Sequence, residues 1–166
     1  EDWRLPPERR AEDLAGRLSW EDIAGLMLFS PHQMVPFLPG GPFVGHYQGK
    51  DYQEGVTDPS SLTDEQVDFI LHGRLRNVLL NHIGSTAAAV GWNNRIQALA
   101  EEQRWGIPVC ISSDPRHSAG RRAAEFSAEG REVSRWPEGL GMAAAFSPEL
   151  MRSFAEVVSK EYRALG

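Results

Sequence analysis

The chain has 166 residues, of which 41% are hydrophobic, and this size and composition are those of one ordinary domain that buries a core. Its net charge is -6 with acidic and basic residues interspersed, whereas nucleic acids and anionic membranes require clustered Lys and Arg. No apolar run approaches the roughly 20 residues of a membrane span. We therefore expect neither a nucleic-acid partner nor a membrane span.

The sequence carries no signature of a cofactor or a metal site. The single Cys110 lies in an apolar stretch, which predicts a small buried core residue in preference to a catalytic thiol. The Gly-Gly-Pro segment at 40–42 lacks the glycine pattern and the lysine of a phosphate-binding loop. No second His or Cys stands at ligand spacing from His117. We expect no cofactor and no metal.

The first third of the chain predicts two helices followed by a loop. Apolar residues recur at helical spacing from Glu8 to Leu18, and Ser19 followed by two acidic residues is typical of a second helix start. The apolar run from Ile23 to Phe29 either completes that helix or forms a buried strand. The Pro- and Gly-rich stretch 30–61 predicts a long irregular loop, which either faces a substrate or is a variable surface excursion.

Helices and short buried strands alternate in the rest of the chain. Thr63 and Gln66 form a capping-box pattern that opens a helix ending at Gly73. The later elements are a strand at 77–81, a helix at 87–105, a strand at 109–112, a polar loop at 114–138 and a helix beginning at Ser147. The alternation predicts an α/β fold with parallel strands and crossover helices, either doubly wound or part of a (β/α)₈ barrel.

Candidate binding residues follow the strand at 109–112, because loops leaving the carboxyl ends of parallel strands build ligand sites. Asp114 is suited to accept hydrogen bonds from a polyol, and Arg116 to hold its charge state and orientation. Alternatively, the Asp114-Pro115 pair merely begins a turn, and spacing alone weights the two interpretations equally. His117 has three candidate roles: metal ligand, base, or partner of a loop carbonyl.

Aromatic and acidic residues elsewhere give weaker signals. Trp92 and Trp136 have the side chains that stack on sugar rings, but core packing is the commoner fate of tryptophan. Two carboxylate pairs lie in a loop or on a helix surface, and we interpret them as solvated charges: Asp51 with Glu54, and Glu101 with Glu102.

Three segments resemble, in order and spacing, the N-terminal domain of family 3 glycoside hydrolases, which include β-glucosidases. They are Glu8 to Phe29, Trp92 to Asp114, and Trp136 to Gly166. The resemblance spans nearly the whole chain except the stretch 30–61. The family's usual pattern around its substrate-binding aspartate is Gly-Ile-Asp-Ala-Val-His-Gly; Asp114 and His117 match that pattern, whereas Pro115 and Arg116 depart from it.

The resemblance implies that residues 1–166 are the N-terminal portion of a (β/α)₈ barrel in a retaining, exo-acting β-glycosidase. It implies that Asp114 binds sugar hydroxyls and that the nucleophile and the acid lie later in the parent chain. From their places beside Asp114, we expect Arg116 and His117 to be further substrate-binding residues. The expected partners are a β-linked glycoside and the remainder of that chain. A start at Glu1 is compatible with a processed periplasmic or secreted protein. The alternative is a non-catalytic carbohydrate-binding α/β module.

Overall fold

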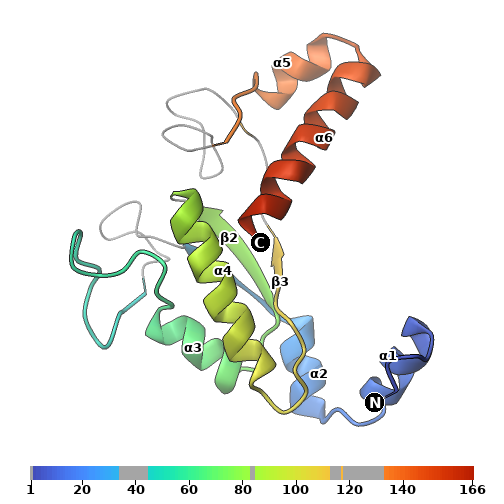
Figure 1. The fold of residues 1–166 in the computed structure, drawn as a ribbon, viewed down its shortest axis with the longest axis vertical. Coiled ribbons are helices and arrows are strands. Elements are labelled where there is room, and N and C mark those ends of the chain that lie inside the picture. The colour runs from blue at the N-terminus through green and yellow to red at the C-terminus, as the bar shows by residue number, and fades with distance from the viewer. Residues whose placement is uncertain (1, 34–44, 83–84, 113–116, 118–132) are drawn as a thin grey trace.

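A computed structural model describes residues 2–33, 45–82, 85–112, 117 and 133–166. Its centre is a three-stranded parallel sheet in the order β1-β2-β3 (Figure 1). The strands are β1 (Phe29–Gln33), β2 (Asn77–His82) and β3 (Cys110–Ser112); the helices are α1 (Pro7–Ala15), α2 (Trp20–Met27), α3 (Asp64–Leu71), α4 (Thr86–Glu101), α5 (Gly139–Ala144) and α6 (Pro148–Leu165). The predicted α/β class and the parallel pairing are confirmed, while a barrel remains a prediction.

Reciprocal caps fix the starts of α2 and α3. The Ser19 hydroxyl accepts the Asp22 N–H at 3.2 Å, and the Asp22 carboxylate accepts the Ser19 N–H at 3.0 Å. Thr63 and Gln66 make the same pair of bonds at 3.1 and 2.8 Å. Each box satisfies backbone donors that the first helical turn leaves without partners. Both predicted helix starts are confirmed, and the ambiguous apolar run resolves into the end of α2 at Met27 followed by β1.

The predicted loop at 30–61 is wrong at its beginning, because β1 continues through Gln33. Proline has no N–H to give to a sheet, so Pro31 argued against a strand, but β1 lies at an edge of the described sheet, where proline is tolerated. Residues 34–44 lie outside the described part of the chain. From 45 to 61 the chain is irregular apart from one antiparallel bridge between Tyr47 and Lys50.

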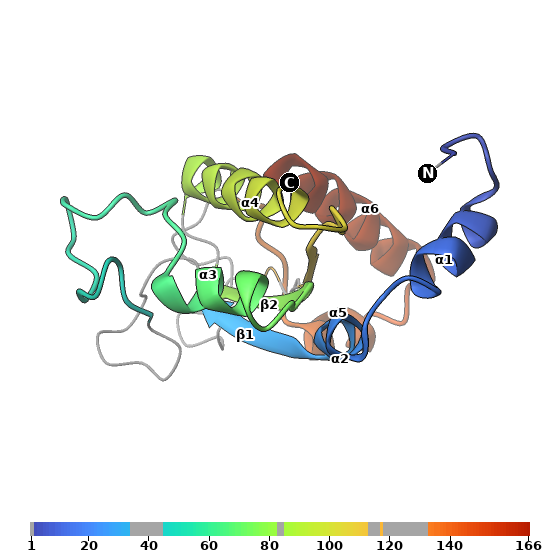
Figure 2. The same ribbon diagram turned by 90° about the horizontal axis from the view of Figure 1, so that it is seen from below.

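The core lies on the side of the sheet that α3 and α4 cover (Figure 2). Trp92 and Ile96 of α4 are 0% exposed and pack with Val78 of β2 and Ile70 of α3. The indole of Trp92 donates to the Gln66 side-chain oxygen at 3.2 Å, so its one polar atom is satisfied inside the core. Core packing, the commoner fate of tryptophan, is confirmed for Trp92.

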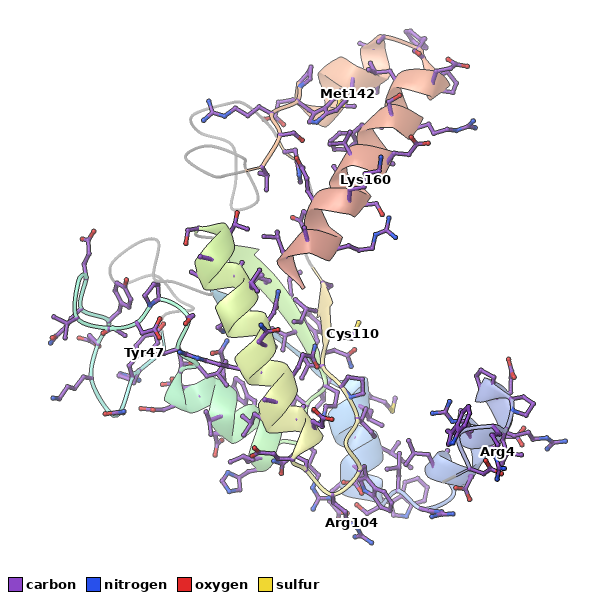
Figure 3. All side chains as sticks on the ribbon, viewed as in Figure 1. Arg4, Tyr47, Arg104, Cys110, Met142 and Lys160 are labelled. Carbon is purple, nitrogen blue, oxygen red and sulfur yellow. The ribbon has the colours of Figure 1, made fainter. Side chains whose placement is uncertain are left out.

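The prediction that Cys110 is a buried core residue is wrong for this structure, in which its thiol is exposed. Successive strand residues point to opposite faces of a sheet, so Ile111 packs against the core while Cys110 and Ser112 face the other way. Figure 3 shows the Cys110 side chain directed away from α4. Phe29, in register with Asn77 beside Cys110, is also 64% exposed on that face.

The C-terminal end of helix α6 contacts α4, and the rest of the helix extends away from the sheet (Figure 1). Val158 and Leu165 are buried, and the Asn93 amide of α4 donates to the Leu165 carbonyl. Helix α1 has no buried residue and stands apart from the sheet (Figure 1). Among the described helices, none is long and apolar enough to cross a membrane.

Candidate functional site

The predicted site follows β3, at the carboxyl end of the sheet. Of its three predicted residues, Asp114 and Arg116 lie outside the described part of the chain. His117 is described, five residues beyond the end of β3 at Ser112. Substrate binding by these residues therefore stays a prediction, and the surroundings of His117 are what the structure adds.

The His117 side chain is enclosed by α6. Its residue is 2% exposed, and its Nε2 lies 2.7 Å from the Glu161 Oε2 atom. The imidazole packs against the rings of Tyr162 and Phe154, with centroids 5.7 and 6.1 Å away. The backbone of His117 has a φ of 51°, a left-handed conformation that side-chain-bearing residues adopt at a cost. A strained backbone is thus held by a buried, paired side chain.

The Glu161 carboxylate contacts both ends of the segment 117–134, at His117 and at Ser134. Its Oε1 accepts the Ser134 N–H at 2.9 Å, and its Oε2 accepts the Ser134 hydroxyl at 2.9 Å in addition to contacting His117. Burial raises the pKa of Glu161, but the bonds from Ser134 and His117 outweigh it and hold that pKa below its ordinary value. The carboxylate is therefore ionised at neutral pH.

Trp136 contacts the same group of side chains. Its backbone N–H donates to the His117 carbonyl at 2.7 Å, and its indole N–H donates to the Ser134 hydroxyl at 2.9 Å. The indole ring meets Phe154 edge-on at a centroid distance of 5.3 Å. Both the polar atom and the ring of Trp136 thus have partners within the protein. We call His117, Ser134, Trp136 and Glu161 the α6 anchor.

Ser134 and Glu161 were not among the predicted site residues. Glu161 lies within the segment that resembles family 3 glycoside hydrolases, but it is 44 positions from His117, and nothing in local spacing connects them. The structure identifies them, because His117, a residue of the predicted site, is buried and contacts Glu161.

The remaining acidic candidates are surface groups. The four residues of the two carboxylate pairs are exposed, which confirms their interpretation as solvated charges: Asp51, Glu54, Glu101 and Glu102. Within the described ranges, no group of three or more His, Cys, Asp or Glu side chains is placed to hold a metal ion. These four carboxylates therefore form no enclosed site.

A polar cluster lies at the other end of the sheet, where the strands begin. Asp22 is its centre: it accepts hydrogen bonds from the Arg74 guanidinium at 3.0 Å and from the Trp105 indole at 3.1 Å. These residues border a cavity of about 360 Å³, and the Arg104 guanidinium lies 4.5 Å from the centre of the Trp105 ring. In parallel α/β folds this end contributes to stability, and ligand sites lie at the opposite end.

Known proteins align with the whole chain. It is 34% identical over 168 residues to a periplasmic β-glucosidase/β-xylosidase of Dickeya chrysanthemi, in an alignment that covers 100% of this chain and 23% of that protein. The chain is a homologue of β-glucosidases. Two fungal proteins agree: a probable β-glucosidase C of Aspergillus oryzae is 35% identical and β-glucosidase C of Emericella nidulans 31% identical, each over 96% of this chain and 22% of theirs.

These relatives confirm the resemblance to family 3 glycoside hydrolases of the β-glucosidase type. No family model matches the chain. This β-glucosidase homologue spans about a quarter of the length of the relatives it matches, from 22% to 23%. The size of the aligned segment indicates that this chain corresponds to one part of a glycosidase.

Proposed function

We propose that this chain is the opening segment of the barrel domain of a retaining, exo-acting β-glycosidase that hydrolyses terminal, non-reducing β-linked sugars. The alignment of the whole chain with β-glucosidases carries the proposal. Its parallel sheet, with helices covering one face, is compatible with the first strands of a (β/α)₈ barrel. The proposed substrate is a β-linked oligosaccharide or glycoside, and the proposed partner is the remainder of the parent chain.

In this proposal Asp114 binds hydroxyl groups of the terminal sugar. A carboxylate has only acceptor sites, so it holds two neighbouring hydroxyls in a fixed orientation. Arg116 would keep that carboxylate ionised by its charge, because an adjacent guanidinium favours the charged form. His117 would support the site from the buried side, since its Nε2 already lies against Glu161.

The chemistry itself is assigned to residues outside this chain. Retention by double displacement needs a carboxylate nucleophile and a carboxylic acid about 5–5.5 Å apart across the scissile bond. The exposed carboxylate pairs of the described residues provide no enclosed site for such chemistry. We therefore assign this segment a binding role and expect no hydrolysis by it alone. A periplasmic or secreted location is part of the proposal and is supported by the relative that is named periplasmic.

The test is hydrolysis of an aryl β-glucoside by the full-length protein that contains this chain. Asp114→Ala should lower kcat/KM by about 100-fold or more, because hydrogen bonds between a charged group and the sugar are lost from the reacting complex. Glu101→Ala is the matched control, since this exposed carboxylate at the end of α4 is not assigned to the site. Equal kcat/KM values for the two variants would disprove the role of Asp114, and no hydrolysis of any aryl β-glycoside would disprove the glycosidase.

A further inference from the structure

We propose that the outward face of α2 is a docking surface for the last strand–helix unit of the parent barrel, the unit whose strand pairs with β1. The inference rests on the proposed function, which makes this chain the opening segment of such a barrel, and it names the part of the parent chain that covers one apolar face of the segment. We call Trp20, Ala24, Met27 and Leu28 the α2 outer face.

The α2 outer face is apolar and exposed. Trp20 is 84% exposed, Met27 is 80% exposed and Leu28, which follows the helix, is 56% exposed; Ala24 between them is exposed as well. Counted from Trp20, the other three lie four, seven and eight positions further on, so all four share one face of the helix. Scattered exposed apolar residues are ordinary, whereas a contiguous apolar group marks a contact surface.

The opposite face of α2 is already fixed to the sheet. The Asn77 side chain of β2 donates to the Leu26 carbonyl at 2.8 Å, and the Arg74 guanidinium donates to Asp22 at 3.0 Å. Gly25 lies so close to Arg74 that an added Cβ would be 2.5 Å from its carbonyl oxygen. These contacts hold α2 in its present orientation. Because a helix that is apolar on both sides is buried on both sides, the outer face needs a cover from another segment.

The position of α2 in the fold selects that segment. The helix ends at Met27 and β1 begins at Phe29, so the outer face leads directly into the strand (Figure 2). Within the described sheet, β1 pairs with β2 alone and lies at an edge. In a closed (β/α)₈ barrel the last strand pairs with the first. The unit that reaches the open edge of β1 therefore arrives beside the α2 outer face.

Length and chemistry both favour a segment of the same protein. The relatives are matched over only 22% to 23% of their length, so most of a protein of that size lies outside the aligned part. The outer face is uncharged, so it fits apolar side chains and not a sugar, whose hydroxyl groups need hydrogen-bond partners. A segment of the same chain also binds at a high effective concentration, an advantage that a second copy lacks.

The experiment measures alkylation by iodoacetamide in the full-length native protein. We expect Met27→Cys to react at least about 10-fold more slowly than Val56→Cys, because a covered thiol is inert to reagents. Val56 is the matched control, since it is 77% exposed and lies in the irregular segment before α3. Equal rates at the two positions would overturn the docking surface. Protection that is lost when the protein is diluted about 100-fold would also overturn it, because a second copy would then be the cover.

Photocrosslinking from Trp20 identifies the covering segment. With p-benzoylphenylalanine in place of Trp20, irradiation of the full-length protein should attach this position to a peptide from the last strand–helix unit of the barrel domain. Attachment to a peptide from any other part of the protein would overturn the proposal. Hydrolysis of an aryl β-glucoside is measured on the same samples. An inactive protein with Met27→Cys protected would disprove the glycosidase and leave the docking surface standing, whereas an active protein with Met27→Cys reactive would disprove the docking surface alone.

Discussion

Asp22 joins three segments where the strands begin. It accepts the Ser19 N–H of the α2 cap, the Arg74 guanidinium ahead of β2 and the Trp105 indole ahead of β3. The hydrogen bond from the Ser19 backbone is the main cause that holds the pKa of Asp22 below its ordinary value. A carboxyl group whose pKa is lowered by folding stabilises the folded state above its unfolded pKa, near 4, and this stabilisation is lost as the pH falls through the folded pKa.

Asp22→Asn should therefore destabilise the protein in a pH-dependent way. At pH 7 we expect a loss of about 1–2 kcal/mol in the free energy of unfolding, typical of hydrogen bonds to a charged group, and a much smaller loss at pH 3. Urea unfolding at the two pH values measures the difference. Asp13→Asn, which removes an exposed ion pair of α1 with Arg17, should change stability by less than about 0.5 kcal/mol. A loss for Asp22→Asn that is the same at both pH values would contradict the argument.

Sequence reasoning at the residue scale succeeded where the partners are close in the chain. The boxes Ser19 with Asp22 and Thr63 with Gln66 each span one helical turn, so their residue types and spacing suffice to predict the bonds. His117 was selected as a site residue, but its partner Glu161 lies on a helix that begins 31 residues later. Its burial is a consequence of tertiary packing, which the spacing of the site motif does not contain.

Among the secondary-structure elements, α2 depends on a close approach that only glycine permits. A Cβ atom added at Gly25 would lie 2.5 Å from the Arg74 carbonyl oxygen and 2.8 Å from that of Gly73. Both are backbone atoms, so neither yields by rotating a side chain. Gly25→Ala should destabilise the protein by about 1–3 kcal/mol although alanine favours helix by up to about 1 kcal/mol.

A second helical glycine provides the control for this prediction. Gly139 begins α5, and a Cβ added there has nothing within 4 Å, so Gly139→Ala should leave stability unchanged or raise it by up to about 1 kcal/mol. Thermal unfolding of the two variants gives the comparison. Similar thermal midpoints for the two variants would show that α2 moves away from the backbone of residues 73–74 without loss of stability.

The boundaries of elements were predictable only where local chemistry marks them. The apolar run from Ile23 to Phe29 contains both the end of α2 and the start of β1, and neither periodicity nor composition separates the two. Pro31 favoured a loop because proline is rare inside sheets. An edge strand tolerates proline, but the edge position of β1 is a property of the whole sheet and is not visible in the local sequence. Helix α4 ends at Glu101, four residues before the predicted end at Trp105, and the indole of Trp105 donates a hydrogen bond to Asp22, a partner distant in sequence.

At the scale of the whole molecule, the face of the sheet opposite α4 gives a direct test of the proposed barrel. This face carries the exposed residues Phe29 and Cys110. In a (β/α)₈ barrel the strand residues that point away from the helices fill a packed interior. If the parent protein closes such a barrel, the Cys110 thiol becomes buried among apolar side chains, where a structural thiol is inert to reagents.

We therefore expect Cys110 in the full-length native protein to resist alkylation by iodoacetamide and to react once the protein is unfolded in urea. The extent of labelling is measured by mass spectrometry of the peptide that contains Cys110, so cysteines elsewhere in the parent chain do not interfere. Ser153→Cys is the matched control, because position 153 is exposed on α6 and should react in the native state. Labelling of Cys110 as fast as position 153 in the native protein would mean that this face stays open to solvent, and the barrel would have to be abandoned while the homology to β-glucosidases stands.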